Sequence, residues 1–136
     1  MPNSKQTSTQ IVAPIAIGEL IDKITILEIK AERIADPAKL RNVLNELKIL
    51  QELKSTAGLD TSDMEAYSRE LKALNAMLWN IEDEIRELEA RQDFGQRFIE
   101  LARNVYRTND RRARVKQRIN AAFGSELVEE KSYKGA

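Results

Sequence analysis

The feature that most constrains this chain is a run of apolar residues that recurs in alternating steps of three and four between Ser62 and Arg91. This spacing places all of them on one side of an α-helix, and four heptads make a rod of about 43 Å. The apolar positions are Met64, Tyr67, Leu71, Leu74, Leu78, Ile81, Ile85 and Leu88. Such a helix is long for a small globular domain, and the sequence predicts an all-α fold built around it.

The long helix should begin at a capping box formed by Ser62 and Glu65. Asp93 stands three residues before Gln96 and repeats that pattern more weakly, so we expect the chain to turn over 92–95 and return as a second arm. The result is a long antiparallel helical hairpin. The apolar pattern weakens over 107–110, where Asn109 or Asp110 could cap a separate last helix, so the sequence leaves open whether the second arm is one helix or two before it ends at Gly124.

Two shorter helices are expected before the hairpin. The first should run from an N-cap at Gly18 to about Ala35, and it is apolar on two sides, which predicts a central helix or a subunit interface. Asp36-Pro37 then predicts a helix start, because Asp accepts hydrogen bonds from free amides and Pro has no amide to leave unpaired. This second helix should end before Gly58.

The 136 residues suit one domain. We expect a helical domain over 11–124, a disordered tail over 1–10 and a mobile C-terminal tail over 125–136. Residues 11–17 are apolar but contain Pro14, which favours a short extended arm. The arm is too short to span a bilayer and lacks the flanks of a signal peptide, so a cytoplasmic protein is predicted.

Cysteine and histidine are both absent from the sequence. Their absence excludes disulfides, thiolate or imidazole metal sites, and nucleophilic triads that depend on either residue. We therefore predict neither a metal nor another cofactor. The 22 basic and 22 acidic residues balance, so binding to nucleic acid or to an anionic membrane would need a local basic patch.

One segment, 97–118, is strongly basic, with eight Arg or Lys residues and two acidic ones, a net charge of +6. Arg side chains suit carboxylate and phosphate ligands. The candidate binding residues are Arg103, Tyr106, Arg107, Asn109, Asp110, Arg111, Arg114 and Lys116. The favoured interpretation pairs the basic segment with the acidic run 82–89 across the hairpin. Nucleic-acid binding is disfavoured, because Tyr106 is the one aromatic residue near the middle of the segment.

Four charged residues lie on the otherwise apolar first helix and are candidates for buried charges: Asp22, Lys23, Glu28 and Arg33. An ionic network that fixes the helix register is favoured over catalysis. Trp79 lies outside the seam of the long helix, so we expect it to pack under one of the first two helices or to contact a partner.

Three stretches, 11–34 (IVAPIAIGELIDKITILEIKAERI), 74–89 (LNAMLWNIEDEIRELE) and 98–120 (FIELARNVYRTNDRRARVKQRIN), with EEKSY at 129–133, resemble a small all-helical bacterial family of unknown function. The resemblance implies a setting near surface-polysaccharide and glycosyl-transfer genes. It also marks Tyr106, Asn109, Asp110, Arg111 and Lys116 above other surface residues. A fainter likeness, IDKITILEIKAERI, is to the all-helical chorismate mutases, which implies a cofactor-free enzyme.

The sequence thus supports three hypotheses of function. The leading one is a non-enzymatic helical module that forms a homodimer or higher homo-oligomer and presents its arginines to an acidic protein or a phosphorylated small molecule. The resemblance adds an accessory role in surface-glycan synthesis as one setting for it. The second is a chorismate-mutase-like enzyme with Arg107, Arg111 and Glu28 in an interhelical pocket. The third is nucleic-acid binding.

Overall fold

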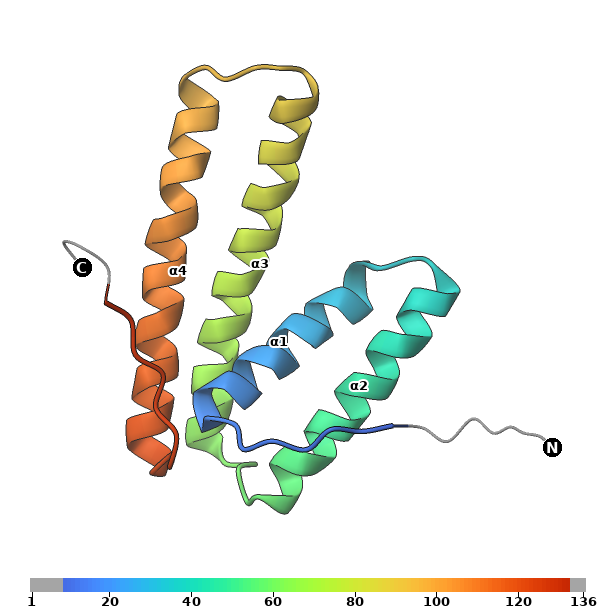
Figure 1. The fold of residues 1–136 in the computed structure, drawn as a ribbon, viewed down its shortest axis with the longest axis vertical. Helices are drawn as coiled ribbons and strands as arrows, with labels where there is room; N and C mark the ends of the chain where they lie inside the picture. Colours follow the sequence, from blue (N-terminus) through green and yellow to red (C-terminus); the bar gives the residue numbers. More distant parts are fainter. Residues whose placement is uncertain (1–8, 133–136) are drawn as a thin grey trace.

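The computed structural model describes residues 9–132, and these residues form four helices and no strand. The helices are α1 (Ile17–Arg33), α2 (Pro37–Thr56), α3 (Ser62–Ala90) and α4 (Gln96–Phe123). Figure 1 shows two antiparallel hairpins, α1 with α2 and α3 with α4, and the first leans away from the second. The predicted all-α fold, with its long hairpin, is confirmed.

α3 and α4 form the long hairpin that the heptad pattern predicts. The stripe of α3 is buried against α4 around Leu71, Leu74 and Ile81, and Val115 and Ile119 face it from α4. Of the two alternatives for 107–110, the structure shows the continuous one, because α4 runs through these residues without interruption. Asn109 does not cap a new helix; its side-chain oxygen instead accepts a hydrogen bond from Arg112 at 3.3 Å.

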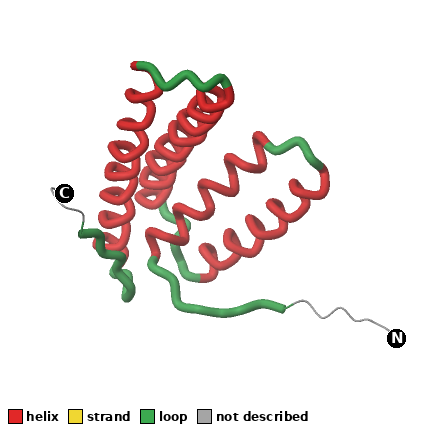
Figure 2. The backbone as a smooth tube through the Cα atoms, turned by 45° about the horizontal axis from the view of Figure 1, so that its top comes forward, coloured by secondary structure: helices red, strands yellow, loops and turns green. Residues whose placement is uncertain are grey.

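α1 is the central helix, as its two apolar sides predict. It packs against α2, α3 and α4, whereas α2 packs mainly on α1 and contacts the start of α3 through the ion pair of Lys54 with Glu65 at 3.1 Å (Figures 1 and 2). One side of α1 supplies Leu20, Ile24 and Leu27, and Ile21 and Ile29 are buried as well. Both apolar sides are therefore covered within one chain.

Several predicted helix ends are confirmed and others shift. Asp36 caps α2 by accepting from the amide of Lys39 at 2.9 Å, and Gly58 and Gly124 have the positive φ expected after a helix. The cap of α3 is Thr61, which accepts from Met64 at 3.1 Å, so the prediction of Ser62 was one residue late. Asp93 accepts a hydrogen bond from the amide of Gly95 at 3.1 Å, and it does not form the capping hydrogen bond expected with the amide of Gln96 at the start of α4.

The start of α1 is held by the end of α4, not by a cap of its own. The amide of Ile17 donates to Ser125 Oγ at 3.0 Å, and the amide of Gly18 donates to Asn120 Oδ1 at 2.7 Å. Gly18 is therefore the second residue of the helix and not its N-cap, which corrects the sequence prediction. A Cβ at Gly18 would lie 2.5 Å from the carbonyl oxygen of Lys116, so the glycine permits the close approach of the two backbones.

The two terminal segments, 9–16 and 125–132, meet near the start of α1. Residues 9–16 form the expected extended arm, and Ile11 and Val12 on it are 90% and 86% exposed. Residues 125–132, expected to be mobile, are held against α1 and α4 through Ser125 and Glu129. The rest of the predicted tails, residues 1–8 and 133–136, lie outside the described residues. Among the described helices, none has the length and hydropathy needed to cross a membrane.

Candidate functional site: an arginine surface beside a buried ionic network

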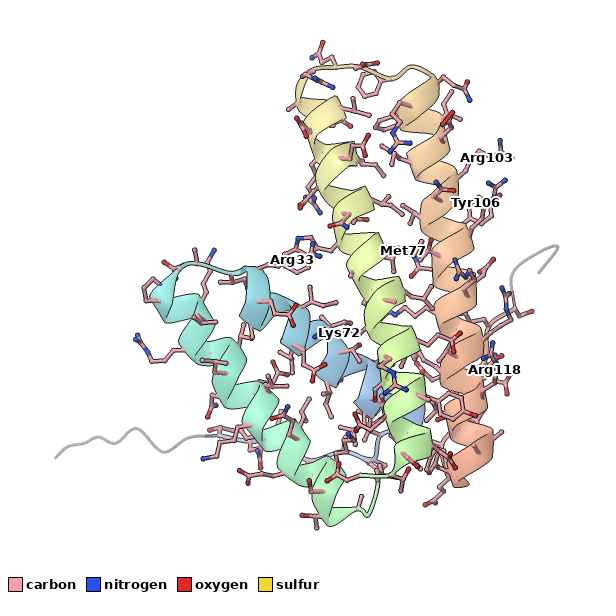
Figure 3. The ribbon with its side chains drawn as sticks, turned by 180° about the vertical axis from the view of Figure 1, so that it is seen from behind. Arg33, Lys72, Met77, Arg103, Tyr106 and Arg118 are labelled. Carbon is pink, nitrogen blue, oxygen red and sulfur yellow. The ribbon has the colours of Figure 1, made fainter. Side chains whose placement is uncertain are left out.

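Four arginines form an exposed row on the outer side of α4: Arg103, Arg107, Arg111 and Arg114. We call these four residues the arginine row. At 100° per residue they lie within an arc of about 80° on one face of the helix. Figure 3 shows Arg103 extending from α4 on the side away from α3. The sequence therefore folds into a positively charged ridge about 17 Å long.

No arginine of the row forms an ion pair with any residue between 9 and 132. The favoured pairing with the acidic run 82–89 is therefore wrong for the row. It holds for Arg97, whose Nε lies 2.6 Å from Glu84 Oε2. The helical phase of α4 explains the difference: Arg97 lies on the flank beside Glu84 of α3, whereas the row lies on the outer side of α4.

Tyr106 and Asp110 lie at the edge of the row. Tyr106 is 55% exposed, and the guanidinium of Arg107 lies 5.9 Å from the centre of its ring, within cation–π range. Asp110 is partly buried and is the one acidic residue between Arg103 and Arg114. The surface therefore combines several unneutralised cations with one exposed aromatic ring.

A second cluster lies on the opposite side of α4, where α1, α3 and α4 meet. Its centre is Asp22 of α1, whose side chain has no exposed surface. Arg112 donates two hydrogen bonds to this carboxylate, from Nε to Oδ1 at 2.9 Å and from Nη2 to Oδ2. This two-pronged contact is the geometry in which a guanidinium holds a carboxylate most firmly. The hydrogen bond to Asp22 raises the pKa of Arg112.

The remaining polar groups around Asp22 are also hydrogen-bonded. Asn75 of α3 donates to Asp22 Oδ1 at 2.9 Å and to Thr25 Oγ1 at 2.9 Å. The Thr25 hydroxyl donates in turn to the backbone oxygen of Asp22 at 2.8 Å. Since buried polar groups are costly when unpaired, this arrangement ties the three helices to one register.

Lys116 extends the cluster toward the C-terminal segment. Its Nζ lies 2.7 Å from Glu19 Oε2, 3.1 Å from Glu129 Oε1 and 3.9 Å from Asp22 Oδ2. Burial acts to lower the pKa of Lys116, but the hydrogen bonds to Glu19 and Glu129 outweigh it and the pKa is raised. We call Asp22, Thr25, Asn75, Arg112, Lys116, Glu19 and Glu129 the ionic network. Its cations are fully paired, which favours a structural role.

The candidate residues thus divide between two places. Asn109 and Lys116 were predicted to belong to the binding surface, but they face the ionic network. Of the four charges expected to be buried on α1, Asp22 is buried, Glu28 is partly buried, and Lys23 and Arg33 are exposed. Burial was therefore wrongly predicted for the last two.

Arg33 and Trp79 instead meet at the far end of α1. Arg33 Nη1 donates to Asn80 Oδ1 at 2.7 Å, and its guanidinium lies 5.6 Å from the centre of the Trp79 ring. Trp79 is partly buried beside α1, in line with the first of the two roles expected for it. Figure 3 shows Arg33 pointing from α1 toward α3.

Sequence reasoning missed five members of the network: Glu19, Thr25, Asn75, Arg112 and Glu129. A signal was present for two of them. Asn75 lies four residues after Leu71 and three before Leu78, and Arg112 lies three residues before Val115. A polar residue at such a spacing inside an apolar stripe indicates a buried partner.

The enzyme hypothesis needs Arg107, Arg111 and Glu28 in one pocket, and the structure does not bring them together. The two arginines are exposed on α4, whereas Glu28 is partly buried on α1. The hydrogen bond to Glu32 raises the pKa of Lys72 on α3, and the negative charge of Glu28 adds a weaker effect in the same direction. Within residues 9–132 no group of three acidic side chains is arranged to hold a metal ion. The geometry therefore offers a charged surface and a paired network.

The fold and these two features define a small all-helical bundle protein with an arginine-rich face. The chain belongs to a family of unknown function, DUF6165, whose model matches residues 11–136. Comparison with curated proteins and with solved structures gives no match. The family description names no activity, so the surface-polysaccharide setting and the chorismate mutase likeness stay untested predictions.

Proposed function

We propose that this protein is a non-enzymatic interaction module that binds an acidic protein partner through the arginine row of α4. The observation that supports this proposal is the absence of any acidic partner for the four arginines among residues 9–132. Other cations of the same segment, Arg97, Arg112, Lys116 and Arg118, have carboxylates within 4 Å. The row is the part of the basic segment left for an external anion.

The shape of the row favours an extended partner over a small phosphorylated ligand. Its guanidinium groups are spread along about 17 Å of a convex helix and do not converge on one point. A single phosphate would reach few of them, whereas a chain with several carboxylates can meet them in succession. Arginine and tyrosine are also enriched at protein interfaces, and Tyr106 borders the row.

Binding can be measured with a fluorescent peptide of about twelve residues, mostly Glu, by anisotropy at moderate and high salt. We expect micromolar binding that weakens at least about tenfold in the double variant Arg103→Glu/Arg111→Glu. A matched control is Arg41→Glu/Arg69→Glu, which makes the same charge change at exposed positions on α2 and α3. The control should bind like the wild type, and all three proteins should keep the same unfolding midpoint.

Three results would overturn the proposal. One is no binding of the acidic peptide by the wild type. Another is equal weakening in both double variants, since that would reflect net charge alone. The third is tighter binding of a DNA or RNA oligonucleotide of the same charge, with steep salt dependence, which would favour a nucleic-acid ligand.

Self-association is a second part of the proposal, and the N-terminal arm supports it. Ile11 and Val12 are 90% and 86% exposed, and both apolar sides of α1 are covered within the chain. A homodimer that buries the two arms would be the default assembly. Light scattering should give a dimer mass for the wild type and a monomer mass for Ile11→Asp/Val12→Asp. A monomer mass for the wild type at all micromolar concentrations would contradict it.

A further inference from the structure

One flank of the α3–α4 hairpin carries a regular series of charges at seven-residue spacing. On α3 the positions are Glu70, Met77 and Glu84, and on α4 they are Arg97, Asn104, Arg111 and Arg118, so the charges are interrupted at Met77 and Asn104. Seven residues make almost two full turns, so each series stays on one side of its helix. In an antiparallel pair these flanking positions face each other.

An ion pair joins α3 to α4 near each end of this flank. Arg97 Nε lies 2.6 Å from Glu84 Oε2 near the turn, and Arg118 Nη1 lies 3.6 Å from Glu70 Oε1 near the other end. The hydrogen bond from Arg97 also lowers the pKa of Glu84. The register of the flank is therefore fixed by contacts on both sides of its middle.

The middle of the flank departs from this pattern. Met77 stands where a glutamate stands seven residues before and after it, and Asn104 and Arg111 occupy the two middle positions of the series between Arg97 and Arg118. Arg111 has no ion pair with any described residue, and Met77 is 42% exposed. Figure 3 shows Met77 on α3 beside α4, while Arg103 and Arg118 extend from α4.

The register that pairs Glu70 with Arg118 puts Met77, an exposed apolar side chain, at the level of Arg111, which has no ion pair within the described residues. By the same register a glutamate at position 77 would continue the series of carboxylates that face α4, so the methionine does not serve the charge balance of the monomer. Methionine is flexible and polarisable, and it is used at surfaces that contact varied apolar side chains. A ligand made of charges alone would leave this side chain unused.

We propose that the partner of the arginine row is an acidic protein segment with a large apolar residue between its carboxylates, which packs on Met77 while the carboxylates pair with Arg107, Arg111 and Arg114. This inference rests on the proposed function, because it uses the same arginines. It adds the chemistry of the partner: the apolar contact selects among acidic segments, and the arginines supply the general attraction.

The test compares two Glu-rich peptides of about twelve residues that differ at one central position, Leu in one and Ser in the other. Wild-type protein should bind the Leu peptide about tenfold more tightly. Met77→Ala should abolish that preference and leave binding of the Ser peptide unchanged. Leu53→Ala, at a 45% exposed apolar position on α2, is the matched control and should keep the preference.

A third variant, Met77→Glu, completes the series of glutamates on α3. It should weaken binding of both peptides, because the new carboxylate competes for Arg111. Met77 is exposed enough that each substitution should leave the helical circular dichroism unchanged.

The outcomes separate this inference from the proposed function. Equal affinity of the wild type for both peptides, or a preference that survives Met77→Ala, overturns the inference while the arginine row remains a binding surface. Binding of neither peptide overturns both. A preference that is lost equally in Leu53→Ala also overturns the inference, since the apolar contact would then lie elsewhere.

Discussion

Arg111 and Arg112 are adjacent in the chain, but they lie in two regions of the molecule with opposite chemistry. Arg112 faces the crossing of α1, α3 and α4, where it holds the buried Asp22 with two hydrogen bonds. Arg111 faces solvent on the outer side of α4 and has no ion pair with a described residue. One step along a helix turns a side chain by 100°, so helical phase alone separates the two roles.

The two regions also differ in how their charges are satisfied. In the ionic network each cation has a carboxylate partner within the chain, and Lys116 has three within 4 Å. In the arginine row the cations are left to solvent. Substitutions in the network should therefore change stability, whereas substitutions in the row should change binding.

The largest loss of stability is expected from Asp22→Asn. The amide keeps the shape of the carboxylate but leaves Arg112 without its countercharge in a partly buried site. Breaking one partner of a buried ion pair costs about 3–5 kcal/mol. Urea unfolding would measure the difference, with Asp83→Asn as a control at an exposed position. A loss below about 1 kcal/mol would contradict the central place given to Asp22.

Lys116→Gln should cost about 1.5–3 kcal/mol at neutral pH, because charged hydrogen bonds to Glu19 and Glu129 are lost. The pKa of Lys116 is raised above 10.5 in the folded protein, so the folded state holds this proton more tightly than the unfolded state. The stabilisation is then complete below pH 10.5 and is lost as the pH rises through the folded pKa. Unfolding of wild type and variant should converge above that pH; a constant difference would contradict the prediction.

Gly18→Ala should cost about 1–3 kcal/mol, because the added Cβ would meet the Lys116 carbonyl oxygen at 2.5 Å and must push α1 from α4. Thermal unfolding measures the change. Gly95→Ala is the comparison, since its Cβ would meet one side-chain oxygen, of Asp93, at 3.3 Å. Equal effects at the two glycines would mean that the close approach at Gly18 is relieved without cost.

The sequence predicted the helices well, because their periodicity is local. The heptads of α3, the Asp36 cap of α2 and the ends at Gly58 and Gly124 all depend on residues within a few turns of each other. The continuity of α4 over 107–110 could not be decided from the sequence, because polar residues there resemble a helix end. Thr108 is in fact buried and Asn109 bonds Arg112, so tertiary contacts use these side chains within one helix.

The candidate site was less predictable, because its chemistry depends on the register between helices. Composition showed that 97–118 is basic but could not divide it into paired and unpaired arginines. The pairing of Glu84 with Arg97 fixes that register, and the helical phase of α4 turns the arginine row away from the acidic run of α3. Asp22 was recognised as buried, but its partners Asn75 and Arg112 lie 53 and 90 residues away in sequence.

The smallest effect on stability is expected from Arg111→Ala, and it sharpens the comparison between the two neighbouring arginines. Since Arg111 contacts no carboxylate of the described chain, its loss should change the free energy of unfolding by less than about 0.5 kcal/mol. Arg112→Ala should behave like Asp22→Asn, because it leaves the carboxylate of Asp22 buried without its bidentate partner. Paired urea unfolding and peptide-binding measurements on both variants test this. If Arg111→Ala destabilised the fold as much as Arg112→Ala, the arginine row would be part of the fold and not a surface kept for a partner.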